Sequence, residues 1–172
     1  LEVNKNGFGA LPIQRRNMDD SVEILLHAYE NGIDFYDTAH FYTDSEAKLG
    51  KAFEDVRENI YLASKGAAEE VEDFWNQLET SLKSMKTDYL DLYQFHNISF
   101  CPKSDDDLYK AMLEAKEEGL IKHIGITTHK ITFAHEAIES GLYETLQYPF
   151  SYLSGKQEIN LVNKCKEFDV GF

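Results

Sequence analysis

Apolar residues recur along the chain in two alternating patterns. In the first, they fall at intervals of three and four residues, which is typical of one face of an amphipathic helix. This pattern covers residues 22–29, 49–56, 71–82, 108–115, 134–138 and 159–165. In the second, apolar residues form short runs of strand type, at residues 8–13, 33–36, 60–63, 89–95, 123–126 and 145–148, with a last run opening at Val170. The alternation predicts parallel strands joined by crossover helices.

The predicted strands are evenly spaced. From residue 33 onward they start 27, 29, 34, 22 and 25 residues apart, close to the ~30 residues of one βα unit. This spacing favours an α/β fold of the (β/α)8 TIM-barrel class over a doubly wound sheet. About six βα units and the start of a seventh strand are present, whereas a closed barrel has eight. We therefore expect residues 1–172 to form one barrel domain whose C-terminal units lie in a longer chain.

The ends of the predicted helices carry local signals. Three amphipathic stretches close with a similar motif before the next strand, at residues 30–33, 117–120 and 139–142, each with glycine in third place. Glycine there predicts a left-handed backbone just past a helix end. At the first helix, Asp20 and Glu23 are spaced as an N-terminal capping pair.

Composition and charge narrow the classes of partner. The chain is 42% hydrophobic and 28% charged, as in ordinary soluble globular proteins, and its 17 Lys and Arg against 31 Asp and Glu leave a net charge of −14. This acidity argues against nucleic acid or an anionic membrane as partner. No apolar run is long enough to span a membrane and no signal-peptide pattern is present. Two cysteines, Cys101 and Cys165, suit neither a disulfide framework nor a four-thiolate metal site, so we predict a cytoplasmic protein without a metal.

Polar residues follow the predicted strands at their carboxyl ends, where barrel enzymes carry their catalytic groups. Asp37 and Tyr42 follow the second predicted strand, Lys65 the third and His96 the fourth. A phenol with a pKa near 10 is a poor acid at neutral pH. We expect Lys65 to lower the pKa of Tyr42, and Asp37 to fix and neutralise Lys65. His96 would hydrogen-bond a substrate oxygen and relay a proton.

Each of these residues also has an ordinary structural explanation: Lys65 as a solvated lysine, Asp37 as a turn-capping aspartate, Tyr42 as a rim aromatic and His96 as a hydrogen-bonded polar group at the same rim. Their joint placement at successive strand ends favours a site. The spacing of His123, His129 and His135 places them on a strand, a loop and a helix, so they do not predict a metal cluster.

The second strand region resembles the signature of a known family. Residues 32–39, Gly-Ile-Asp-Phe-Tyr-Asp-Thr-Ala, followed by Tyr42, Ser45-Glu46 and Leu49-Gly50, are similar to the signature of the aldo-keto reductases. Lys65 and His96 complete what resembles that family's Asp-Tyr-Lys-His tetrad, in order. Residues 94–97 and 147–151 look closest to the prokaryotic branch related to the iron–sulfur-containing aldo/keto reductases.

The resemblance implies an oxidoreductase that reduces an aldehyde or ketone. Hydride would pass from a nicotinamide cofactor, NADPH or NADH, to the carbonyl carbon of a small-molecule substrate, while Tyr42 donates the proton. Thr127 and Thr128 stand where the family usually has Ser-Asn, and with Gln147 they would hold the nicotinamide carboxamide. Thr43 replaces the glycine that often follows the tyrosine. An iron–sulfur cluster is implied only for a longer chain.

The resemblance also implies contacts that residues 1–172 do not supply. In the family, the loops after strands seven and eight bind the pyrophosphate and the adenosine phosphate, so this stretch alone is expected to bind NADPH poorly. Two alternatives to an active reductase stay open: a nicotinamide-binding sensor or regulatory barrel, and an inactive truncated barrel that pairs its open edges with another copy. The sequence leaves the substrate and the oligomeric state open.

Overall fold

Parallel strands form one curled sheet in the computed structural model, which describes residues 3 and 6–172. Within those residues the sheet has six strands in the order β1-β2-β3-β4-β5-β6, so each strand pairs with the next along the chain. The strands are β1 (Phe8–Gly9), β2 (Phe35–Asp37), β3 (Tyr61–Gly66), β4 (Leu90–His96), β5 (Ile121–Thr127) and β6 (Thr145–Gln147).

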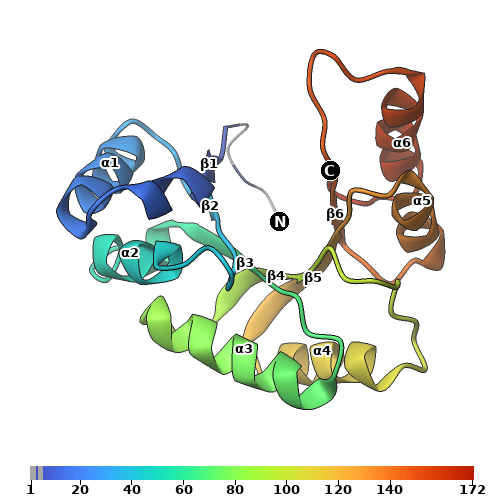
Figure 1. Cartoon of the computed structure of the whole chain (residues 1–172), viewed down its shortest axis with the longest axis horizontal. Helices are drawn as coiled ribbons and strands as arrows, with labels where there is room; N and C mark the ends of the chain where they lie inside the picture. The colour runs from blue at the N-terminus through green and yellow to red at the C-terminus, as the bar shows by residue number, and fades with distance from the viewer. Residues whose placement is uncertain (1–2, 4–5) are drawn as a thin grey trace.

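The helices cover the outer, convex side of this sheet (Figure 1). They are α1 (Met18–Glu30), α2 (Ser45–Ala52), α3 (Val71–Ser84), α4 (Asp107–Glu117), α5 (Ile131–Ser140) and α6 (Lys156–Glu167), with short 3-10 helices η1 (Leu11–Arg15) and η2 (Arg57–Asn59). Strand and helix alternate from β2 onward, and the sheet curls without closing (Figure 1). The predicted partial (β/α)8 barrel is confirmed.

The main core lies between the sheet and the helices. Tyr36 of β2 packs on Phe53 with ring centroids 4.4 Å apart, and Phe74 of α3 packs edge-on against Tyr93 of β4 at 5.9 Å. These rings are almost fully buried, as are the inward faces of α4 and α5. Burial of one face of each helix explains the three-and-four spacing of apolar residues in the sequence.

Two local predictions at the N-terminal end are wrong. The run at residues 8–13 is a strand only at Phe8–Gly9, because Pro12 lacks an N–H for the ladder and the chain turns into η1 instead. Helix α1 begins at Met18, and its cap is Asn17, whose side chain accepts the N–H of Asp20 at 2.8 Å. The capping pair expected at Asp20 therefore lies one turn too late.

The glycines after three helices have the predicted left-handed backbone. Their φ values are +88° at Gly32, +78° at Gly119 and +67° at Gly141. The run that opens at Val170 contributes an isolated parallel bridge between Gly171 and Thr145, beside β6.

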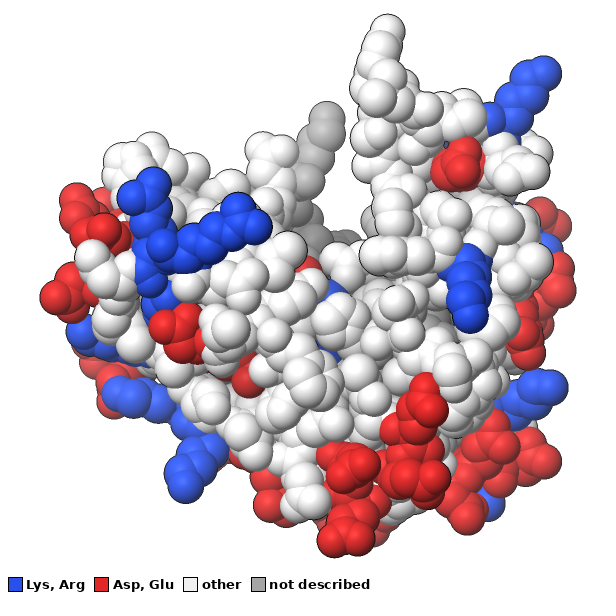
Figure 2. Space-filling view, in the orientation of Figure 1, with Lys and Arg blue, Asp and Glu red and all other residues white. Residues whose placement is uncertain are grey.

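Charge is unevenly distributed on the surface. Acidic side chains gather along the lower rim of the view in Figure 2, over α3 and α4, as the net charge of −14 leads one to expect. No helix in the described part of the chain is both long enough and apolar enough to cross a membrane.

Candidate active site

The register of the sheet brings the predicted polar residues to one edge. Asp37 is the last residue of β2 and His96 the last of β4, while Lys65 is the penultimate residue of β3. His96 pairs in register with Thr127, which pairs in turn with Gln147 of β6. Since all strands run in the same direction, these residues gather at the carboxyl edge of the sheet.

Lys65 and Asp37 form the predicted ion pair. Lys65 Nζ lies 2.7 Å from Asp37 Oδ2 and also donates to the backbone oxygen of Thr38 at 2.5 Å. The Lys65 side chain is 1% exposed and that of Asp37 18% exposed. Burial lowers the pKa of Lys65, and the Asp37 carboxylate opposes this shift. The pair therefore keeps an ammonium group in a buried position at the floor of the site.

Tyr42 and His96 face each other above this pair. Their rings meet edge to face with centroids 5.6 Å apart, and Lys65 Nζ lies 5.3 Å from the centre of the Tyr42 ring. The loop that carries Tyr42 is held by two backbone bonds, from Tyr42 N to Ala39 O and from Ser45 N to Tyr42 O. Tyr42 thus sits in a tight turn between β2 and α2.

The protonation states at the site differ from those predicted. The pKa of Tyr42 is raised, first by burial and second by the Asp37 carboxylate, so the expectation that Lys65 lowers it is wrong. Burial, with Lys65 nearby, lowers the pKa of His96 to about 4, so its imidazole is neutral at neutral pH.

A pocket of about 290 Å³ opens over these side chains. It is lined by Asp37, Tyr42, His96, Thr127, His129, Gln147, Tyr148 and Pro149. The Gln147 side-chain amide lies 3.4 Å from Asp37 Oδ2, which joins β6 to the tetrad residues. Thr127 Oγ1 accepts the N–H of Asn97 at 3.1 Å and keeps its own hydrogen to donate. A larger surface groove of about 630 Å³, beside Cys101 and α5, contains none of the tetrad residues.

Thr128 is not among the residues that line this pocket. Its side chain is buried, and its hydroxyl accepts the N–H of Lys130 at 3.0 Å, so it stabilises the turn into α5. The resemblance to the family assigned Thr128, together with Thr127, to the nicotinamide carboxamide, and for Thr128 this stays a prediction.

Three pocket residues were missed from the sequence: His129, Tyr148 and Pro149. Each lies one or two residues past a residue that the sequence did assign, Thr127 or Gln147. The signal available was their position in the loops just after β5 and β6, the places where barrel sites are built.

A second buried carboxylate lies behind the pocket. Glu46 of α2 is 5% exposed and accepts a hydrogen bond from the Ser64 hydroxyl at 2.6 Å. Ser64 directly precedes Lys65 in β3. Burial raises the pKa of Glu46, opposed by the Ser64 hydrogen bond. The Ser45-Glu46 part of the sequence signature thus fastens α2 to the strand that carries Lys65.

Comparison with known proteins agrees with this arrangement. The model of the Aldo/keto reductase family matches residues 6–172. This chain belongs to the aldo/keto reductase family. Over 173 residues it is 28% identical to the uncharacterized oxidoreductase YqkF of Bacillus subtilis, a match that covers 92% of this chain and 56% of that protein. It is 35% identical over 117 residues to the methylglyoxal reductase DkgB of Salmonella typhi, covering 64% of this chain and 43% of that one.

Solved structures of aldo-keto reductases share the fold. The holo form of AKR11C1 from Bacillus halodurans superimposes with a TM-score of 0.86 at 26% identity, over 99% of this chain and 61% of that one. An aldo/keto reductase of Klebsiella pneumoniae, in complex with NADP and acetate, gives a TM-score of 0.87 at 24% identity, over 98% of this chain and 62% of that one. The chain spans about half the length of the curated relatives it matches.

The structure shows a role for several residues of the family signature. Asp37 pairs with Lys65, and Glu46 fastens α2 to β3. Gly50 lies where a Cβ would meet Ser84 O at 2.5 Å, so α2 and the end of α3 pack too closely there for a larger residue. The aldo/keto reductase signature in this chain therefore encodes both the site and the helix packing that supports it.

Proposed function

We propose that the whole protein reduces an aldehyde or ketone with a reduced nicotinamide cofactor, and that Tyr42 donates the proton to the carbonyl oxygen. The observation that carries the proposal is the joint placement of Tyr42 and His96 on one pocket, above the buried Lys65–Asp37 ion pair. Membership of the aldo/keto reductase family supports the reaction class.

Tyr42 holds the proton that it would donate, and its raised pKa makes the phenol a weaker acid than a free tyrosine. With its pKa raised by burial and by Asp37, Tyr42 carries its proton at neutral pH. As the phenol gives that proton to a carbonyl oxygen, the developing phenolate is stabilised by the Lys65 ammonium, 5.3 Å from the ring centre. Asp37 holds that ammonium in place. Water then returns a proton to the phenolate to complete the cycle.

His96 acts in this proposal as a neutral hydrogen-bond donor. With a pKa of about 4 its ring carries one N–H at neutral pH, which can donate to the substrate oxygen. The edge-to-face contact with Tyr42 holds the two groups on the same side of the pocket. His96 would thus orient the carbonyl and leave the proton transfer to Tyr42.

The pocket's other polar groups fit a nicotinamide. A carboxamide needs both donors and acceptors; the Gln147 amide supplies both and the Thr127 hydroxyl supplies a donor. When bound, the reduced nicotinamide supplies the hydride. NADP in the Klebsiella pneumoniae structure supports NADPH as the cofactor. The phosphate contacts are expected from residues outside 1–172, and we propose Thr127 and Gln147 as the nicotinamide contacts within it.

A single substitution tests the assignment. In the whole protein, steady-state NADPH oxidation is measured with a panel of small aldehydes and quinones, for the wild type and for Tyr42→Phe. The variant is expected to lose at least ~100-fold in kcat, in line with the loss of a general acid, and to keep its affinity for NADPH. Tyr29→Phe is the matched control, because Tyr29 belongs to α1, packs its ring against Phe53 and does not line the pocket.

The possible outcomes separate the candidate roles. Equal turnover by the wild type and Tyr42→Phe would show that Tyr42 is not the donor. Binding of NADPH without turnover by the wild type would instead assign the protein to the sensor or regulatory class.

A further inference from the structure

The residue after Tyr42 has an unusual backbone. Thr43 has a φ of +44°, in the left-handed region that a β-branched residue seldom adopts. Such a conformation is strained and persists only where the surrounding structure holds it. Glycine would take it without strain. The loop therefore needs something that compensates for a threonine at this position.

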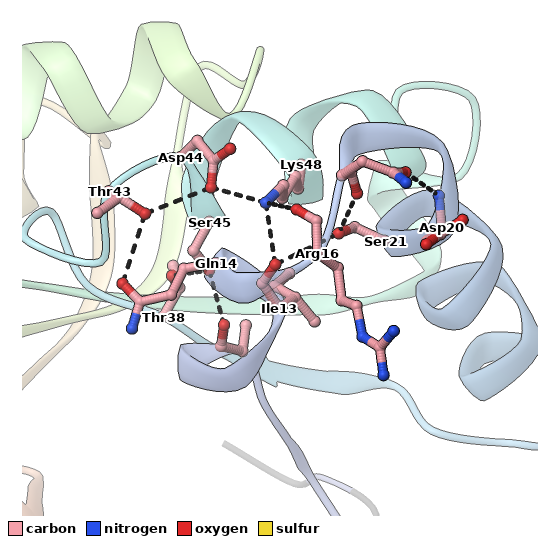
Figure 3. Close-up of polar contacts among 12 residues, drawn as sticks. Ile13, Gln14, Arg16, Asp20, Ser21, Thr38, Thr43, Asp44, Ser45 and Lys48 are labelled. Atoms are coloured by element: carbon pink, nitrogen blue, oxygen red, sulfur yellow. Dashed lines mark hydrogen bonds and ion pairs between the residues drawn. The ribbon is translucent and has the colours of Figure 1, made fainter.

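The Thr43 hydroxyl supplies part of this compensation, because its one proton faces two acceptors and can be donated to either of them. The hydroxyl lies 3.4 Å from Gln14 Oε1 and 3.3 Å from Asp44 Oδ1, and Figure 3 shows it between the two. Gln14 belongs to η1, 29 residues earlier in the chain. The hydroxyl thus links the Tyr42 loop to a separate element.

Lys48 of α2 binds Asp44, one of the two acceptors of the Thr43 hydroxyl. Its side chain is fully buried, and its Nζ donates to Asp44 Oδ1 at 2.7 Å, to Ile13 O at 2.9 Å and to Arg16 O at 2.7 Å (Figure 3). All three donor sites of the ammonium are used. One buried cation therefore joins α2, η1 and the carboxylate that accepts from Thr43.

We propose that Lys48 is a positioning residue for Tyr42, acting through Asp44 and Thr43. The ammonium fixes Asp44 and η1 relative to α2, and these hold Thr43 in the left-handed conformation. Because Thr43 follows Tyr42 directly, this conformation sets the direction in which the phenol enters the pocket. The effect on catalysis rests on the function proposed above, whereas the effect on the loop does not.

The first test compares two lysines on the same helix. Lys48→Met removes the charge and keeps the length of the side chain, and Lys51→Met does the same at an exposed position whose partner, Asp19, is also exposed. In the whole protein, Lys48→Met is expected to lower kcat about 10-fold, because misplacing a reacting group by less than 1 Å has effects of this size. KM for NADPH is expected to stay within twofold, and Lys51→Met to match the wild type.

The second readout does not depend on activity. Hydrogen exchange of the backbone amides in residues 40–47 is followed by mass spectrometry in the same variants. Lys48→Met is expected to speed exchange in this segment at least 10-fold and to leave β4 and β5 unchanged. The Lys51→Met variant is expected to exchange like the wild type.

A double substitution separates positioning from general stability. If Lys48 serves to hold a strained Thr43, its importance falls once residue 43 is glycine. The 10-fold effect of Lys48→Met on kcat and on exchange is therefore expected to shrink to about twofold in a Thr43→Gly background. Thr43→Val, which keeps the strain and loses the hydroxyl that donates to Gln14 or Asp44, is expected to behave like Lys48→Met and serves if that variant does not fold.

The outcomes are distinct. Unchanged exchange in both Lys48→Met and Thr43→Val, or an equal effect of Lys48→Met in both backgrounds, would overturn the positioning role. A wild type without turnover would refute the proposed function and leave the exchange test of the loop intact.

Discussion

The pocket holds ionisable side chains whose protonation states are set by burial. Tyr42 keeps its proton because burial and Asp37 raise its pKa, and His96 stays neutral because burial lowers its pKa to about 4. Lys65 is kept charged by its ion pair with Asp37 against the effect of its own burial. At the scale of single residues, the site thus consists of one neutral acid, one neutral hydrogen-bond donor and one paired cation.

The lowered pKa of His96 predicts that its ring gains a proton only at acidic pH. By NMR, the His96 ring protons are expected to titrate with a midpoint near pH 4, whereas an ordinary histidine titrates near 6.5. Since the folded-state pKa is depressed, the folded protein binds fewer protons than the unfolded chain between those values. The free energy of unfolding therefore falls as the pH drops through this window.

The His96→Asn variant identifies the signal and tests the linkage. One imidazole resonance should disappear, and the loss of stability between pH 6.5 and pH 4 should become smaller than in the wild type. A His96 midpoint above pH 6 would contradict the assigned neutral state.

The buried Lys65–Asp37 ion pair predicts that replacing Lys65 lowers the free energy of unfolding more than replacing an exposed lysine. Lys65→Met leaves Asp37 with no cation partner in a largely buried position, and we expect it to lower the free energy of unfolding by about 3 kcal/mol. Lys86→Met breaks an ion pair with Glu54 in which both side chains are at least half exposed, for an expected loss of about 0–1 kcal/mol. Urea unfolding measures both, and equal losses would show that burial of the Lys65 pair has little energetic effect.

At the scale of elements, the periodic pattern located each α-helix of the described residues and nearly every strand, and it missed the 3-10 helices η1 and η2. The starts of the strands at residues 61 and 90 were predicted within one residue, because buried strands begin as continuous apolar runs, whereas β3 continues three residues beyond its predicted end. The strand at 8–13 was predicted too long, since its apolar residues continue into η1, where Pro12 prevents strand pairing. Hydrophobicity alone does not distinguish a short 3-10 helix from a strand.

The packing of α2 on α3 predicts the effect of a methyl group. Gly50→Ala would gain about 1 kcal/mol from helix propensity alone. Its Cβ would meet Ser84 O at 2.5 Å and Met85 Cα at 2.7 Å, however, and backbone atoms give way only at high cost. We expect a net destabilisation of about 2 kcal/mol by thermal or urea unfolding.

Gly9→Ala is the matched control for this substitution, since no atom lies within 4 Å of a Cβ built there. It is expected to change stability by less than 1 kcal/mol. A stabilising Gly50→Ala would mean that the two helices can move apart freely.

At the scale of the molecule, the described sheet curls without closing and carries apolar residues near its β6 end. Phe150 and Phe172 stack edge to face at 5.7 Å, and both are about half exposed. Tyr152 and Leu153 nearby are almost fully exposed. Exposed apolar groups concentrated in one place mark a contact surface.

This surface predicts self-association of residues 1–172 prepared alone. Sedimentation at several concentrations is expected to show a mass above 19.8 kDa that increases with concentration. Leu153→Asp should shift the equilibrium toward the monomer. Leu113→Asp is the control, because Leu113 is a partly exposed residue of α4, away from this surface. A concentration-independent monomer would contradict the prediction.

The sequence by itself determined the barrel class through strand and helix periodicity, and it indicated the family and the tetrad residues through their resemblance to a known signature, because each of these is a local property of the chain. Only the tertiary structure decided how those residues act together. Lys65 meets Asp37 across 28 residues, and Gln147 meets Asp37 across 110. Burial and the distances between such remote side chains set the pKa values of Tyr42 and His96. These quantities exist only once the strands are in register, so no pattern along the chain contains them.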